Sequence, residues 1–171
     1  DIRDFFPSVK SYMIRRMLRN RGARMDATHL LTRLMTYRHH LPQGSPASPC
    51  LAGLVLHPTM QHLRRAVVRV SPIGDVSVYV DDATFSGPAG IRRLKSTLIR
   101  IFERYGFQIN PAKIRSMNRT EEQVSLGIKL NDGIDPPAGY IQKYTTESRR
   151  LGPHHRRCRG MLAHIQNLQR I

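Results

Sequence analysis

The sequence predicts an α+β fold in which helices cover one face of an antiparallel sheet. Two observations predict this class. Apolar residues recur every three or four positions in several stretches, which is typical of amphipathic helices, and shorter β-like segments lie between them. Two of the β-like segments meet at a pair of adjacent aspartates and indicate a hairpin. With 171 residues and 40% hydrophobic content, the chain is long enough for one domain with a core and a small appendage.

The beginning of the chain is predicted to hold two helices and a loop. Pro7-Ser8 indicates the start of the first helix, and Gly22 indicates its end. Asp26 is expected to cap the second helix, whose apolar residues run from Leu30 to Met35. The segment 41–49 is rich in Pro and is expected to be a loop.

The middle of the chain is predicted to form a long helix, a hairpin and a shorter helix. The long helix extends over about 47–70, with a kink at Pro58. The hairpin passes through 79–86, and an amphipathic helix follows from Ile91 to about Gly106. The remaining expectations are β-like segments at 107–109, 115–117 and 124–130, a loop at 131–139, and a very basic helix from Thr145 onward.

The net charge indicates the kind of partner. There are 28 Lys and Arg residues against 12 Asp and Glu residues, which gives a formal charge of +16. Most of the basic residues are Arg, whose planar guanidinium matches phosphate oxygens two at a time. A GC-rich genome is the alternative explanation for this excess of Arg. We expect nucleic acid as the partner.

Other features exclude several kinds of protein. Cys50 and Cys158 have no CxxC spacing, so neither a disulfide frame nor a structural zinc is expected. The histidine pairs at 39–40 and 154–155 are expected to be solvated or to contact phosphate. No apolar run reaches the ~18 residues that a membrane span needs. We therefore expect a reducing, cytoplasmic setting and no membrane partner.

Asp81 and Asp82 are the first candidates for catalysis. Adjacent strand residues point to opposite faces, so only a turn lets both carboxylates converge. Two like charges brought together favour a bound cation, and oxygen ligands favour Mg²⁺ or a related ion. Asp1 lies where a first strand would end, and that strand could lie beside the hairpin. Three such carboxylates can hold two divalent ions for phosphoryl transfer, although a solvated turn is the alternative for the Asp-Asp pair alone.

Five motifs, in order, resemble those of reverse transcriptases, most of all the bacterial retron and group II intron branch. They are DIRDFFPSV at 1–9, LPQGSPASP at 41–49, YVDD at 79–82, GFQINPAK at 106–113 and VSLGI at 124–128. The basic tail at 156–164 is similar to the first thumb helix of bacterial members. Val80 stands where those members commonly carry Ala, which weakens the assignment to a subgroup.

The resemblance implies the architecture and the reaction. A polymerase palm would occupy 1–139, and the exit of the primer grip with the first, basic thumb helix would occupy 140–171. The finger motifs would precede Asp1, so we expect a segment of a longer polypeptide, and activity of the segment alone is left open. The implied enzyme is a bacterial RNA-directed DNA polymerase, a nucleotidyltransferase that adds dNTPs to a primer 3′-OH. Its partners would be an RNA template, a DNA or RNA primer, and the rest of the parent polypeptide.

The resemblance also implies a set of catalytic residues. Asp1, Asp81 and Asp82 would bind two Mg²⁺ ions, with Mn²⁺ as an alternative, and the carbonyl group of Ile2 would be a further ligand. Lys113 would protonate or neutralise the departing pyrophosphate, which suits a cation beside developing negative charge. An ordinary surface lysine is the alternative interpretation of Lys113.

Further residues would contact the nucleotide. The backbone amides of Asp4 and Phe5 would meet the incoming triphosphate, and Phe6 would exclude a 2′-hydroxyl group. The alternative for an aromatic pair is a place in the core. In Gln43-Gly44, the glutamine would contact the nucleotide and the glycine would allow close approach of the backbone.

Nucleic-acid contacts complete the implied site. Tyr79 and Val80 would touch the primer end. The tail would bind template and primer phosphates through Arg149, Arg150, Arg156, Arg157 and Arg159.

Three other functions remain open at this stage. One is template-independent DNA synthesis by a relative from antiviral defence, and another is a catalytically silent RNA-binding scaffold. The third is a two-metal nuclease. The host element, which could be a retron, an intron, a diversity generator or a defence system, also stays open.

Overall fold

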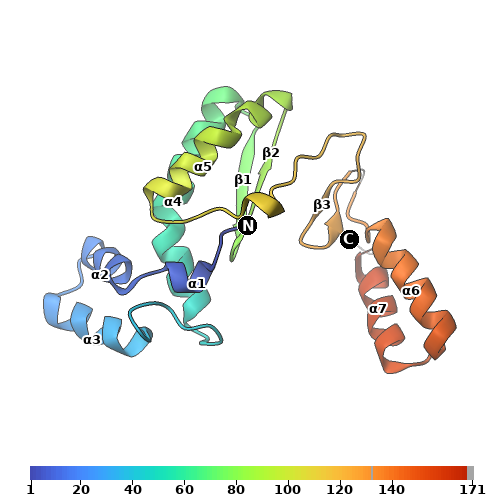
Figure 1. Ribbon diagram of the computed structural model, residues 1–171, viewed down its shortest axis with the longest axis horizontal. Helices are drawn as coiled ribbons and strands as arrows, with labels where there is room; N and C mark the ends of the chain where they lie inside the picture. Colours follow the sequence, from blue (N-terminus) through green and yellow to red (C-terminus); the bar gives the residue numbers. More distant parts are fainter. Residues whose placement is uncertain (132, 169–171) are drawn as a thin grey trace. The chain divides into compact units, whose positions relative to one another are not determined.

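The computed structural model describes residues 1–131 and 133–168 (Figure 1). The chain divides into two compact units, Asp1–Ile114 and Arg115–Ile171. Helices are combined with two small antiparallel sheets, which confirms the predicted α+β class. The expected boundary near residue 139, between a palm and a thumb, stays a prediction.

The first unit begins with two short helices, where one continuous helix was expected. The helices are α1 (Phe5–Ser8) and α2 (Ser11–Asn20), and Gly22 follows the second with a φ of 86°. The break falls at the fully buried Val9, whose carbonyl oxygen accepts a hydrogen bond from the amide of Leu41 at 3.1 Å. This pairing between distant segments keeps Val9 extended, so it overrides the helical spacing of the sequence.

Helix α3 (Met25–Met35) matches the second expected helix, but the face that it buries is unexpected. Thr28 and Thr32 are 1% and 5% exposed, whereas Leu30 and Leu34 are 60% and 73% exposed. The hydroxyl group of Thr32 donates to the carbonyl oxygen of Thr28 at 2.7 Å, which satisfies it inside the core. The apolar spacing therefore predicted the helix correctly but not its buried side.

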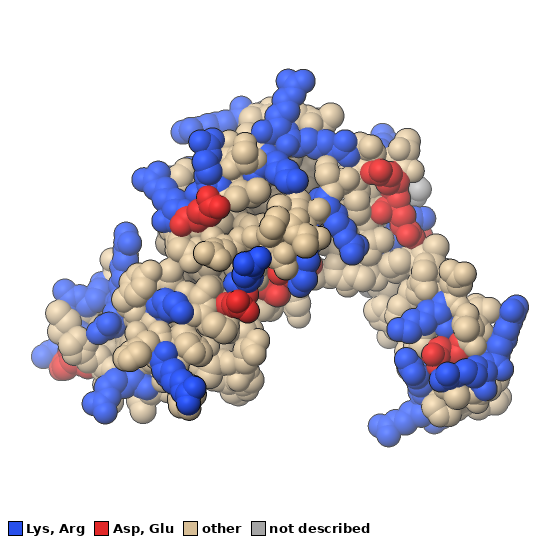
Figure 2. Space-filling model, viewed as in Figure 1, with Lys and Arg blue, Asp and Glu red and all other residues tan. Residues whose placement is uncertain are grey.

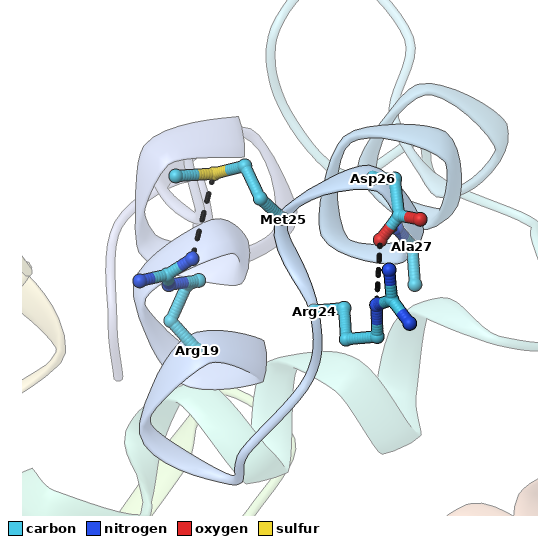
Figure 3. Close-up of polar contacts among 5 residues, drawn as sticks. All are labelled: Arg19, Arg24, Met25, Asp26 and Ala27. Atoms are coloured by element: carbon cyan, nitrogen blue, oxygen red, sulfur yellow. Dashed lines mark hydrogen bonds and ion pairs between the residues drawn. The ribbon is translucent and has the colours of Figure 1, made fainter.

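The start of α3 also differs from the expected cap. Arg24 is the N-cap residue, and Asp26 lies in the first turn. The carboxylate of Asp26 accepts from the amide of Ala27 at 2.9 Å and pairs with Arg24 at 3.6 Å (Figure 3). Asp26 therefore supports the helix start from within the first turn, where a negative charge is favourable.

A long helix and a hairpin form the centre of the first unit. Helix α4 (Ser48–Val70) contains Pro58, and strands β1 (Asp75–Tyr79) and β2 (Asp82–Ser86) pair antiparallel. The hairpin lies against α4 (Figure 1). Along β1, Val76 is buried while its neighbours are exposed, so one face of the hairpin meets the core and the other is open.

The rest of the first unit packs on this centre. The expected amphipathic helix begins as a 3₁₀ turn, η1 (Ala89–Leu94), and continues as α5 (Lys95–Arg104). A second 3₁₀ turn, η2 (Pro111–Lys113), follows the core residue Phe107. Of the segment expected to be β-like at 107–109, only Ile109 pairs, in an isolated bridge with Ile2.

The second unit is a small hairpin followed by two helices. Strands β3 (Val124–Ser125) and β4 (Ile128–Lys129) are shorter than expected, and 115–117 forms no strand. Helix α6 (Ala138–Leu151) starts earlier than the predicted Thr145, because the side chain of Glu122 accepts from the amide of Ala138 at 2.8 Å. Helix α7 (Arg156–Leu168) packs against α6. Of the helices that the structure describes, none combines the length and apolar character needed to cross a membrane.

Phe107 gives a direct test of this core. Its side chain is 1% exposed, and its ring centroid lies 6.2 Å from that of Phe5. We expect Phe107→Ala to lower the free energy of unfolding by about 3–5 kcal/mol, because the truncation leaves a cavity. The control is Leu34→Ala on the exposed face of α3, for which we expect a change below about 0.5 kcal/mol. Urea unfolding followed by circular dichroism measures both, and equal losses would contradict the assigned core.

Candidate active site

A pocket of about 320 Å³ lies in the first unit, where the start of the chain meets the hairpin and η2. Three segments that are distant in sequence contribute to it, and Gln43 lines it from the loop before α4. It is lined by Asp1, Ile2, Arg3, Asp4, Phe5, Phe6, Gln43, Asp81, Asn110 and Lys113.

Backbone hydrogen bonds hold the start of the chain in this place. The amide of Ile2 donates to the carbonyl oxygen of Asp81 at 2.8 Å, and the amide of Arg3 donates to that of Gln108 at 2.7 Å. On the other side, the amide of Asn110 donates to the carbonyl oxygen of Asp1 at 3.0 Å. Ile2 is 1% exposed and anchors the segment in the core. The first residues therefore lie between the hairpin tip and the segment before η2. The sequence analysis expected Asp1 at the end of a first strand that could lie beside the hairpin, and the backbone pairing of Ile2 with Asp81 is compatible with that expectation.

The closest polar contact in the pocket joins Asp1 and Lys113. The Nζ atom of Lys113 lies 2.6 Å from Oδ2 of Asp1, whose side chain is 18% exposed. Lys113 is the last residue of η2, a turn that begins when the side chain of Asn110 accepts from the amide of Ala112 at 3.2 Å. The short turn thus brings an ammonium group onto a largely buried carboxylate.

The tip of the hairpin is a strained two-residue turn. Tyr79 pairs with Asp82, so Val80 and Asp81 form the loop, and Val80 has a φ of 56°. A β-branched residue at positive φ is a steric outlier. Asp4, which also lines the pocket, has a φ of 45°. Two strained residues beside one pocket are typical of functional sites, where the surrounding fold holds the strain.

This register separates the two adjacent aspartates. Asp81 is in the loop and lines the pocket, whereas Asp82 is the first residue of β2 and is not among the lining residues. Tyr79 is 65% exposed at the end of β1, and Val80 packs partly against the core. Of the residues predicted for the site, Asp1, Ile2, Asp4, Phe5, Phe6, Gln43, Asp81 and Lys113 share the pocket.

The aromatic pair and the glycine have distinct surroundings. Phe5 is 5% exposed and belongs to the core, while Phe6 is only partly buried, with its ring centroid 5.4 Å from that of Phe5. Gly44 is outside the lining and has a φ of 85°, with nothing within 4 Å of an added Cβ. Backbone conformation, and not lack of space, therefore requires glycine at this position.

The chemistry of the lining fits a hard cation. Asp1 and Asp81 place carboxylate residues in the lining, and the ammonium group of Lys113 at Asp1 shows that positive charge is accommodated there. The carbonyl group of Ile2 as a further ligand stays a prediction. Across the described ranges 1–131 and 133–168, no three Asp, Glu, His or Cys side chains are grouped closely enough to hold a metal ion. The contribution of Asp82 as a third carboxylate stays a prediction.

Two lining residues were missed by the sequence analysis. Asn110 is followed by Pro111, a pair that commonly starts a short helix and could have indicated η2. The side chain of Ile2, between Asp1 and Arg3, is buried. Because side chains alternate along a strand, Arg3 would have been expected on the same face as Asp1, opposite to that of Ile2.

The basic residues expected to bind nucleic acid lie in the second unit. Each of the five is exposed, and they are Arg149, Arg150, Arg156, Arg157 and Arg159. Oε2 of Glu147 lies 3.8 Å from Arg150 and 3.7 Å from Arg157. This carboxylate therefore joins α6 to α7 and fixes part of the basic surface.

Comparison with known proteins identifies relatives of the chain. The chain is 26% identical to the retron Mx65 reverse transcriptase of Myxococcus xanthus, over 98% of the chain and 45% of that protein. It is 27% identical to the retron Mx162 reverse transcriptase of the same organism, over 92% of the chain and 38% of that protein. A shorter match, over 32% of the chain and 17% of that protein, is 36% identical to the retron Ec86 reverse transcriptase of Escherichia coli. The chain thus spans less than half the length of these curated relatives.

The family match covers the whole first unit. Residues 1–130 match the family described as reverse transcriptase (RNA-dependent DNA polymerase), and all residues that line the pocket fall within this range. The resemblance inferred from the sequence motifs is thereby confirmed at the level of the family, and the chain belongs to the reverse transcriptases.

Proposed function

We propose that this chain is the catalytic core of an RNA-directed DNA polymerase, which adds deoxynucleotides to the 3′-OH group of a primer on an RNA template. One observation supports the proposal above all. Asp1, Asp81 and Lys113 come from three distant segments and line the same pocket in a chain with a charge of +16. Acids are scarce in such a chain, so their collection at one pocket indicates a role other than surface charge.

The lining oxygens would hold the divalent ions that this reaction uses. Asp1, Asp81 and the carbonyl group of Ile2 would be ligands, with Asp82 as the third carboxylate and Mg²⁺ or Mn²⁺ as the ion. When bound, such ions activate the attacking hydroxyl group and stabilise the charge on the departing pyrophosphate. The contribution of the protein is to fix these oxygens through the hydrogen bonds that hold Ile2 and Arg3 in place.

The remaining pocket residues would handle the nucleotide. The amides of Asp4 and Phe5 lie at the start of α1, where helical N–H groups have no intrahelical acceptor and are available to the triphosphate. Lys113 would leave Asp1 to meet the negative charge that develops on pyrophosphate. Gln43 would contact the nucleotide from the opposite loop, and Gly44 would allow the backbone to adopt its left-handed conformation there.

The long partners would be bound outside the pocket. Tyr79 and Val80 at the hairpin end would touch the primer terminus. The basic surface of α6 and α7 would hold template and primer phosphates with little sequence preference. A palm over 1–139 and a thumb helix within 140–171 would be completed by the fingers of a longer polypeptide.

Phe6 provides a test of nucleotide selection. Its half-buried ring lines the pocket, where it would block a 2′-hydroxyl group. We expect Phe6→Ala to raise the incorporation of ribonucleotides relative to deoxynucleotides by about 10–100-fold, because a steric block of this size is removed. Single-nucleotide kinetics with both substrates measures the ratio. Phe5→Leu is the control, since it should lower stability without altering the ratio.

Primer extension on an RNA template tests the proposed reaction itself. A polypeptide that contains this chain and its finger segment is incubated with a labelled primer, template and dNTPs. Template-directed lengthening of the primer supports the proposal. Homopolymer synthesis without template would support the defence-type alternative, shortening of the primer a nuclease, and binding without turnover a scaffold.

A further inference from the structure

A tight turn between α3 and α4 has an unusual composition. The amide of Tyr37 donates to the carbonyl oxygen of His40 at 2.9 Å, and the amide of His40 donates back to that of Tyr37 at 3.1 Å. Arg38 and His39 form the loop, with φ values of 48° and 65°. Two consecutive positive φ values define a turn for which Asn-Gly is strongly preferred. Here the chain carries two large, basic side chains in a conformation that costs free energy at every non-glycine residue.

The turn is fixed to the start of α2. The amide of Ser11 donates to the carbonyl oxygen of His39 at 2.9 Å, and Lys10 forms a β-bridge with His40. The next residue, Leu41, is fully buried. These contacts over-determine the backbone, so the strained conformation persists and places Arg38 and His39 at a defined position. We call Lys10 together with 37–40 the basic turn.

The side chains of the basic turn are arranged for contact with an anion. The guanidinium carbon of Arg38 lies 5.3 Å from the ring centroid of Tyr37, a cation–π contact that holds the guanidinium over the ring. Tyr37 is 59% exposed, and Lys10, Arg38 and His39 are also exposed. The N–H groups of a guanidinium held in this way remain available to an acceptor in solution.

The stretch of sequence that contains the turn is almost free of negative charge. Between Asp4 and Asp75 the sequence contains a single acidic residue, Asp26, and this carboxylate is paired with Arg24 at 3.6 Å. In the view of Figure 2, the region that carries α2 and α3 displays many more Lys and Arg side chains than Asp and Glu side chains. The complementary partner is therefore a polyanion.

We propose that the basic turn binds the sugar–phosphate backbone of a nucleic-acid strand beside the pocket. This deepens the proposed function, because it assigns a place where the strand is held. Gln43, three residues after His40, lines the pocket, and Lys10 follows the helix that carries Phe5 and Phe6. Arg38 would bind two phosphate oxygens with its planar fork, and Lys10 would add a point charge. Such contacts fix the position of a strand without reading its bases.

The double variant Arg38→Asn with His39→Gly separates binding from folding. It introduces the pair that this turn type prefers and removes the guanidinium. We expect the melting temperature to rise by a few °C, while binding of a fluorescein-labelled single-stranded RNA weakens. The slope of log K against log salt should become shallower by about 0.7, the value for one lost phosphate contact. Fluorescence anisotropy with the complete chain in EDTA, without nucleotide, measures the slope.

Two further variants complete the test. Arg93→Asn removes one exposed charge from η1, and we expect it to leave the slope nearly unchanged. Tyr37→Leu keeps the backbone but removes the ring that holds the guanidinium. We therefore expect a change in salt slope between that of the Arg38/His39 variant and that of the Arg93 variant.

Defined outcomes would overturn the proposal. An equal loss of RNA affinity and of salt slope in the Arg38/His39 and Arg93 variants would mean that Arg38 is an ordinary solvated charge. A lower melting temperature in the double variant would mean that these residues serve the turn itself, and competition by polyglutamate as strong as by RNA would indicate an acidic protein partner. Because the assay involves no turnover, its result is independent of whether the polymerase proposal succeeds.

Discussion

Replacing Asp81 with asparagine is expected to abolish primer extension by a polypeptide that contains this chain and its fingers. Asp81 lies in the strained two-residue loop that brings it to the pocket beside Asp1. Asparagine keeps the size of the side chain but removes the charge that would hold a divalent ion. We expect a loss on the order of 10³-fold or more, comparable with removal of a major electrostatic contribution to catalysis. Extension of a labelled primer under single-turnover conditions measures the loss.

Nucleic-acid binding should be intact or tighter in the same variant, because one negative charge is removed from the site. The matched control is Asp75→Asn, at the other end of β1, where the carboxylate is 60% exposed and 3.6 Å from Arg64. An exposed pair of this kind contributes little to stability, so we expect nearly normal extension. Unchanged extension by Asp81→Asn would refute the two-metal mechanism, and equal loss in both variants would point to damage of the hairpin.

Replacing Lys113 with methionine is expected to have two opposite effects. Extension should fall by about 10²–10⁴-fold if the ammonium group acts on the departing pyrophosphate as a general acid. Binding of Mn²⁺ should become tighter, because the ammonium group 2.6 Å from Asp1 competes for the same carboxylate. Titration calorimetry or Mn²⁺ electron paramagnetic resonance measures the affinity, and single-turnover extension measures the rate.

The control for this variant is Lys95→Met at the start of α5, which removes an exposed ammonium group outside the pocket. We expect this variant to change neither the rate of primer extension nor the affinity for Mn²⁺ appreciably. An unchanged Mn²⁺ affinity in Lys113→Met would show that the ion pair does not compete with metal. Normal extension would show that Lys113 is a surface lysine with no part in the reaction.

Local sequence patterns anticipated much of the architecture. The long helix through Pro58 and a hairpin through 79–86 follow from apolar spacing, and the grouping of Asp1 with Asp81 follows from the order of the motifs. The register of the hairpin could not be predicted from the sequence to within one residue. Both aspartates were expected at the tip, but the pairing of Tyr79 with Asp82 puts Asp82 in the strand. Register depends on packing and turn strain, and strand side chains alternate, so one residue decides which carboxylate meets the pocket.

The sequence by itself determined which residue types and motifs are available: the acids, Lys113, the Gln43-Gly44 pair and the excess of positive charge. Tertiary structure decided which of them meet. Lys113 reaches Asp1 across 112 positions, the helix after Phe5 breaks at Val9 to pair with Leu41, and α3 buries threonines while exposing leucines. The periodic spacing of apolar residues in helices and strands predicts only which residues close in sequence share a face. Contacts between distant segments depend on the packing of the whole core, which no local period encodes.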